Sequence, residues 1–92
     1  MNPKFIEITL TSYPIEANLP FHPTKTIFLN STLIKSIEEV KRISGPTKTL
    51  VAIYIKEYVP GCLRGNEGDF LLTLEPLEYV MAKLGHDWKN LK

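Results

Sequence analysis

The feature that most constrains this chain is an apolar run inside Thr47–Val59, which reads TKTLVAIYIKEYV. From Leu50 to Ile55 every residue is aliphatic or aromatic. Successive side chains of a strand point to opposite faces, so an unbroken apolar run is typical of a central strand that is covered on both sides. The sequence therefore predicts a sheet whose two faces must both be covered by other parts of the chain.

Three more segments have the short, β-branched and apolar character of strands: Lys4–Thr11, Lys25–Leu29 and Phe70–Leu74. In the first of them polarity alternates, which places Ile6, Ile8 and Leu10 inward and Phe5 on the opposite face. The glycine-rich Gly61–Asp69 before the last strand predicts a polar hairpin loop.

The segment Ser31–Ile43 fits two structures. Its apolar residues recur at helical spacing after Ser31, a good N-cap, and Glu38 and Glu39 favour a helix. The alternative is a single turn over Ser31–Lys35 followed by a strand over Ser36–Ile43, joined by a hairpin to the next run.

A helix is predicted near the end of the chain. Pro76 suits the first helical position, and Gly85 suits a C-terminal cap. Between them Leu77, Val80, Met81 and Leu84 form one apolar stripe.

The proline-rich Ser12–Thr24 has no regular pattern, yet it carries several large apolar side chains. We expect this loop to fold back over the core as a cover.

These elements predict one α+β domain over residues 1–92. Four or five mainly antiparallel strands form a curved sheet or small open barrel, and a helix from about Pro76 to Leu84 packs on it. The predicted core consists of Ile6, Ile8, Leu10, Ile27, Leu29, Ile37, Val51, Ile53, Ile55, Leu72, Leu74, Leu77, Val80 and Met81.

The order of these signals resembles the small FlbD-type flagellar proteins and related short bacterial and phage proteins of unknown function. In that pattern a strand that ends in Leu-Asn leads through a turn to I-x-x-I-E-E, and a hairpin and a terminal helix follow. The matching residues are Phe28, Leu29, Asn30, Ile34, Ile37, Glu38, Glu39 and Val40, with Leu77, Tyr79, Val80 and Leu84 in the helix.

The chain departs from that pattern at the inserted Ser12–Thr24 and at the longer hairpin Gly61–Asp69. The resemblance implies the strand alternative for Ser36–Ile43, and we adopt it against the local helix propensity.

Composition excludes few functions. The formal net charge is +1, which gives no overall electrostatic attraction for nucleic acid. The single cysteine, Cys62, excludes an intramolecular disulfide and fits a reducing compartment. The N-terminal sequence lacks the apolar run of a signal peptide, and no apolar stretch is long enough to span a membrane. We therefore expect a cytoplasmic protein.

Motifs for catalysis and cofactors are missing. No phosphate-binding glycine motif is present, and His22, Cys62 and His86 lack the spacing of metal ligands, so no cofactor and no metal are expected. The pair His86-Asp87 has no identifiable nucleophile to serve. On a strand, Glu38 and Glu39 point to opposite faces, which is unsuitable for shared acid–base chemistry. The sequence therefore predicts no enzyme.

A protein-binding or assembly module, with a protein partner or a homo-oligomer, is the predicted function class. Its candidate partner surface is the apolar set of the loop and tail: Tyr13, Phe21, Trp88 and Leu91. The alternative is a nucleic-acid-binding module, whose candidate face comprises Lys35, Lys41, Arg42, Lys48, Lys56 and Tyr54. Glutamates interleaved with these lysines weaken that alternative.

Overall fold

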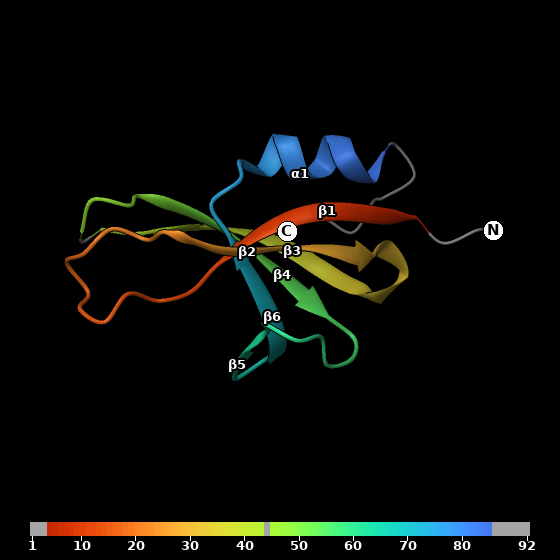
Figure 1. Cartoon of the computed structure of the whole chain (residues 1–92), viewed down its shortest axis with the longest axis horizontal. Helices are drawn as coiled ribbons and strands as arrows, with labels where there is room; N and C mark the ends of the chain where they lie inside the picture. The colour runs from red at the N-terminus through yellow and green to blue at the C-terminus, as the bar shows by residue number, and fades with distance from the viewer. Residues whose placement is uncertain (1–3, 44, 86–92) are drawn as a thin grey trace.

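The computed structural model describes residues 4–43 and 45–85. Along the chain the elements are β1 (Phe5–Thr11), β2 (Pro23–Asn30), the 3-10 turn η1 (Ser31–Leu33), β3 (Ile34–Lys41), β4 (Thr49–Ile55), β5 (Leu63–Gly65), β6 (Gly68–Thr73) and α1 (Leu77–Leu84). The strands form one layer and α1 lies over one side of it (Figure 1). In the described part of the chain no helix is long and apolar enough to cross a membrane.

The sheet has the order β2-β1-β6-β4-β3, with β5 added on β6, and every pairing is antiparallel. The sheet is open and is not closed into a barrel, and the predicted α+β fold with one C-terminal helix is confirmed. The extra strand β5 lies inside Gly61–Asp69, where the sequence predicts only a loop. Its three residues pair with β6, with Leu63 opposite Phe70, and so short a strand leaves no periodic pattern in the sequence.

The central strand β4 is buried on both faces, as its apolar run predicts. Val51, Ile53 and Ile55 belong to a core beneath α1, which we call the helix-side core. Leu50 and Ala52 belong to a second, far-side core on the opposite face. Alternation along one strand therefore divides the interior into two apolar layers.

Most of the predicted core is buried: Ile6, Ile8, Leu10, Leu29, Ile37, Val51, Ile53, Ile55, Leu72 and Val80. Ile27, Leu74, Leu77 and Met81 are only partly buried. The prediction missed further buried residues, namely Phe21, Ile34, Leu50, Ala52, Leu71 and Leu84. Three of these misses are on β4 and β6, where only one face was assigned to the core.

The ambiguous segment is a strand. After the η1 turn, β3 pairs with β4 along its length, with Ile37 opposite Ile53 and Lys41 opposite Thr49. Ile37 is fully buried in the helix-side core. Burial against β4 has overridden the helix propensity of Glu38 and Glu39.

The helix closes a gap in the sheet. β1 pairs with β6 only at Leu10 and Thr11, so earlier residues of β1 have no strand on that side. There the Thr9 N–H donates to Glu75 Oε2 at 2.8 Å, and Lys83 of α1 donates to the Glu7 carbonyl. Lys83 Nζ and Glu75 Oε1 also form an ion pair at 2.7 Å. These side chains, which we call the Glu75–Lys83 clamp, replace a strand along the inner edge of β1.

The proline-rich loop is a cover at one position only. Phe21 is 5% exposed and packs in the far-side core, and its N–H donates to Thr47 Oγ1 at 3.0 Å. Tyr13, Ile15 and Leu19 are exposed instead, which corrects the prediction that the whole loop folds onto the core. The Thr11 hydroxyl donates to the His22 carbonyl at 2.6 Å, and the Thr24 hydroxyl donates to the Leu10 carbonyl at 3.1 Å. These two hydrogen bonds hold the ends of the loop near β1.

Candidate interaction surface

The far-side face of the sheet carries a group of aromatic rings. Tyr54 on β4 and Phe70 on β6 pack with their ring centroids 5.6 Å apart. The Tyr13 and Phe21 rings pack edge to face with their centroids 5.8 Å apart. The Arg42 guanidinium lies 4.9 Å from the Phe21 ring centroid. The four rings come from three segments, namely β4, β6 and the proline-rich loop, and sheet pairing and the loop bring them to one face.

Tyr54 also has a polar partner on this face. Its hydroxyl donates to Glu38 Oε1 at 3.3 Å, across the β3–β4 pair. Burial, followed by the nearby negative charge of Glu38, raises the pKa of the Tyr54 hydroxyl above its usual value of 10.0. Glu38 faces the far-side core, whereas Glu39, opposite Val51, faces the helix side. The two carboxylates therefore lie on opposite faces, as predicted.

The predicted partner surface is only partly present in the described residues. Tyr13 is exposed and available. Phe21 is buried, so its ring stabilises the fold and does not offer a contact. Trp88 and Leu91 lie outside the described residues.

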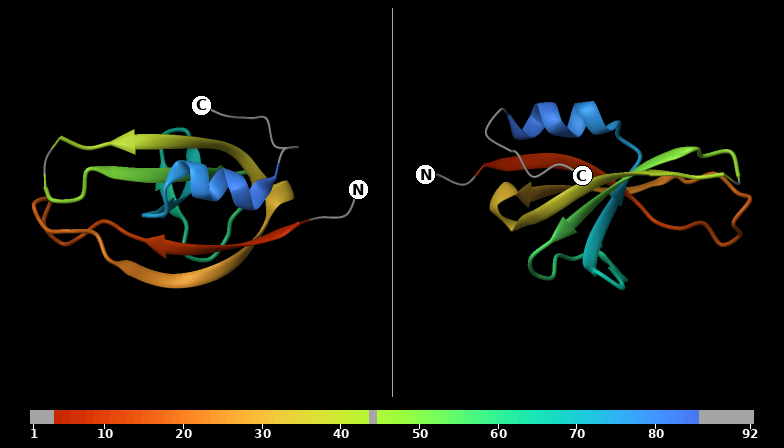
Figure 2. Two further views of the ribbon diagram at one scale, coloured as in Figure 1. Left: turned by 90° about the horizontal axis from the view of Figure 1, so that it is seen from above. Right: turned by 180° about the vertical axis from the view of Figure 1, so that it is seen from behind.

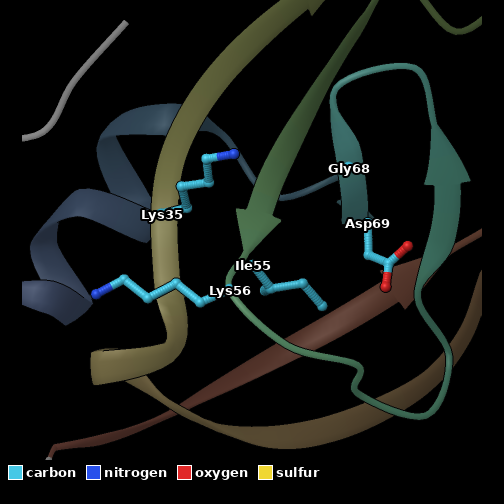
Figure 3. A pocket seen from close by; sticks show the side chains of 5 residues that line it. All are labelled: Lys35, Ile55, Lys56, Gly68 and Asp69. Carbon is cyan, nitrogen blue, oxygen red and sulfur yellow. The ribbon is translucent and has the colours of Figure 1, made fainter.

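The predicted nucleic-acid face is divided between different parts of the molecule. Arg42 and Tyr54 lie over the far-side core, and Lys41 lies on the helix-side face of β3. Lys35 and Lys56 border a separate open hollow of about 540 Å³, together with Ile55, Gly68 and Asp69 (Figure 3). Lys56 extends away from Asp69 there. Because Arg42, Lys41 and Lys56 lie at different places, the predicted set does not form one continuous basic surface.

The structure exposes two sets of apolar side chains that the predicted partner surface did not include. Phe28 on β2 is 72% exposed and Phe5 on β1 is 61% exposed, on the outer face of these paired strands. The alternation that places Ile6 and Ile8 inward places Phe5 outward, so this signal was present in the sequence. The second group contains Ile43, which is fully exposed, and Ile15, which is nearly so, on two loops at one end of the molecule.

Those two loops contact each other. A Cβ at Gly45 would lie 2.9 Å from the Ala17 carbonyl oxygen, so the β3–β4 loop approaches the proline-rich loop closely. Gly45 has φ +81°, a conformation that favours glycine. Figure 1 shows both loops projecting at the same end.

Both outer strands of the sheet have an open edge. β2 and β3 each pair with one neighbour only among the strands of residues 4–43 and 45–85. Figure 2 shows them along opposite margins of the sheet, with α1 over the middle. An open edge exposes unpaired N–H and C=O groups, which can pair with a further strand.

No reactive cluster is found where the structure describes the chain. There, no three His, Cys, Asp or Glu residues come close enough to hold a metal ion. Cys62 is partly buried against the helix-side core. His86, the histidine of the pair His86-Asp87, lies outside the described residues. The absence of catalysis remains a prediction from the sequence.

Comparison with known proteins gives no relative: no family model, curated protein or solved structure matches this chain.

Proposed function

We propose that this chain is a non-enzymatic module that binds or assembles with protein chains. The observation that carries the proposal is the pair of open sheet edges on β2 and β3. Main-chain hydrogen bonds at such an edge provide affinity, and the side chains beside it provide specificity. The FlbD-type resemblance suggests a bacterial or phage multi-protein system as the setting.

The β2 edge is protected against pairing only at its start, where Pro23 and a register shift against β1 lie. Lys25 is the single charged residue of the strand. The Thr26 to Asn30 half is regular and paired without a shift to β1. Phe28 and Phe5 add an exposed apolar surface directly beside this edge. Large aromatic side chains are enriched among the residues that dominate binding energy at protein interfaces.

Nucleic-acid binding is the second candidate, favoured by Arg42 and Tyr54 on one face. Both groups are already engaged, however. Arg42 stacks on Phe21, and Tyr54 packs on Phe70 and donates to Glu38. A base could stack on Tyr54 only if the Phe70 contact opened, and the Glu38 carboxylate would repel a phosphate.

Light scattering of the full chain, with and without mixed-sequence nucleic acid, tests the two candidates. We expect a mass above the 10.5 kDa of one chain without nucleic acid, and no change when nucleic acid is added. A monomer whose mass rises only with nucleic acid at low salt would refute the proposal and favour the alternative.

The contribution of the β2 edge is tested by Phe28→Lys, used with the wild-type chain as bait for protein partners. Lysine on an edge strand opposes pairing, and exposure of Phe28 allows the change without unfolding. Ile15→Lys is the control, because it replaces another exposed apolar side chain, one that lies on a loop and not on a strand edge. We expect Phe28→Lys to lose partners that Ile15→Lys retains.

A further inference from the structure

The β3 edge differs from the β2 edge in its charges. Along β3 and the residue after it, the sequence reads IKSIEEVKR, in which Glu38 and Glu39 precede Val40 and the bases Lys41 and Arg42 follow it. Glu39 and Lys41 are exposed, and Arg42 is partly buried. A strand with opposite charges on either side of its centre can be complementary to itself when it meets a second copy in antiparallel orientation.

The β3–β4 ladder shows which backbone groups face outward. The Arg42 N–H donates to the Lys48 carbonyl at 2.7 Å, so these residues form a hydrogen-bonded pair. Bonded and non-bonded pairs alternate in an antiparallel ladder. Val40 and Glu38 therefore bond to β4, and the N–H and C=O groups of Ile37, Glu39 and Lys41 are directed to the open edge.

Two antiparallel β3 strands can pair in one register that satisfies two conditions. The outward main-chain groups of the two copies meet, and side chains of opposite charge lie opposite each other. With the two-fold axis at Val40, Glu39 lies opposite Lys41 of the second copy. On the other face, Glu38 lies opposite the second copy's Arg42. Each pair occurs twice, and Val40 meets its own counterpart at the centre. The N–H and C=O groups of Glu39 and Lys41 are both directed to the open edge. The two residues of such a pair therefore also exchange main-chain hydrogen bonds.

The neighbouring registers are unfavourable. An axis at residue 38 or 39 places a glutamate opposite its own copy, and an axis at Lys41 places two lysines together, which is destabilising. An axis at Ile37 brings Lys35 into the ladder, but the β3–β4 register is irregular between Ile34 and Ser36. The Val40 axis therefore combines a regular strand with opposite charges at every charged pair.

We propose that two copies of this chain pair antiparallel through β3, about a two-fold axis at Val40. This dimer rests on the proposed assembly function and identifies the partner as a second copy of the chain. Pairing extends the sheet continuously from one copy into the other and gives Arg42 a carboxylate partner. Among residues 4–43 and 45–85, the partly buried Arg42 forms no ion pair. It also brings the fully exposed Ile43 beside Ile37 of the other copy.

Charge reversal tests the register. In Lys41→Glu, both Glu39–Lys41 pairs of the dimer become pairs of like charge, and we expect the dimer to dissociate about 30-fold more readily. Glu39→Lys has the same expected effect. The double variant Glu39→Lys/Lys41→Glu restores opposite charges and the wild-type affinity. Lys25→Glu on β2 is the matched control and leaves the dimer unchanged. The dissociation constant is measured by sedimentation equilibrium of the full chain.

Cross-linking tests the axis. In a Cys62→Ala background, Val40→Cys places two thiols opposite each other at a non-bonded pair, where Cα atoms lie close, and oxidation links the dimer. Phe28→Cys in the same background is the control for pairing through β2.

Three outcomes would overturn this inference. The first is a wild-type chain that stays monomeric at millimolar concentration, and the second is a dimer that is insensitive to both single charge reversals. The third is a dimer that cross-links through Phe28→Cys and not through Val40→Cys. In the last two cases the assembly function stands and only the β3 interface is wrong. A monomer that gains mass only on nucleic acid would instead refute the proposed function itself.

Discussion

Removing the Glu75 carboxylate should loosen the attachment of α1 to β1. In this clamp Glu75 accepts the Thr9 N–H with one oxygen and Lys83 Nζ with the other. The Glu75 and Lys83 side chains are 15% and 25% exposed, so water reaches them only partly. Glu75→Ala leaves a β1 backbone donor without a partner and a lysine without its counter-charge.

The expected loss of stability follows from these two contacts. A hydrogen bond to a charged group contributes about 1.5–3 kcal/mol. The ion pair contributes less than about 1 kcal/mol, because solvent partly screens it. We therefore expect Glu75→Ala to lower the free energy of unfolding by about 2–3 kcal/mol. Glu75→Gln keeps a carbonyl acceptor for Thr9 and loses only the charge, so its expected cost is about 1 kcal/mol.

Urea denaturation of the wild type and both variants measures these differences, at one protein concentration so that self-association contributes equally. A Glu75→Ala variant within about 0.5 kcal/mol of the wild type would show that the clamp does not hold the helix. Equal losses in Glu75→Ala and Glu75→Gln would show that the charge matters and the acceptor for Thr9 does not.

Two further predictions concern the interior and the far-side face. Ile53→Val should lower the free energy of unfolding by about 1 kcal/mol, and Ile43→Val should leave it unchanged, because Ile53 is fully buried and Ile43 fully exposed; equal urea midpoints would contradict this. For Tyr54, the folded state raises the pKa, so its contribution to stability is complete below pH 10.0 and is lost as pH rises above it. The wild type should therefore lose more stability than Tyr54→Phe in alkaline urea titrations, and parallel curves would refute the assigned pKa direction.

The strands of this fold could be predicted wherever one residue pattern decided the structure. β1 alternates between apolar and polar residues, and the Leu50–Ile55 run of β4 consists of aliphatic and aromatic residues only. The helix was also predictable, since Pro76 precedes it and Gly85, at φ 86°, ends it. In each case the local sequence and the tertiary environment favour the same conformation.

Other features depended on contacts between distant residues. β3 was predicted through the family resemblance, because Glu38 and Glu39 locally favour a helix and only pairing with β4 makes the segment a strand. Phe21 was identified as apolar, but its place in the far-side core depends on strands that lie far from it in sequence. For the same reason, Phe21 could not be recognised as unavailable to a partner.

The contrast between a closed inner strand edge and two open outer edges supports the assembly proposal. Where β1 separates from β6, the exposed backbone of Glu7 and Thr9 is satisfied by Lys83 and Glu75. Side chains are thus able to close a strand edge in this fold. The outer edges of β2 and β3 have no such closure among the described strands, although each is eight residues long. On β3, like charges oppose the registers with an axis at residue 38, 39 or 41, and the irregularity near Lys35 opposes the axis at Ile37, so that edge is selective for its partner. The nearly uncharged β2 edge is left for apolar contacts.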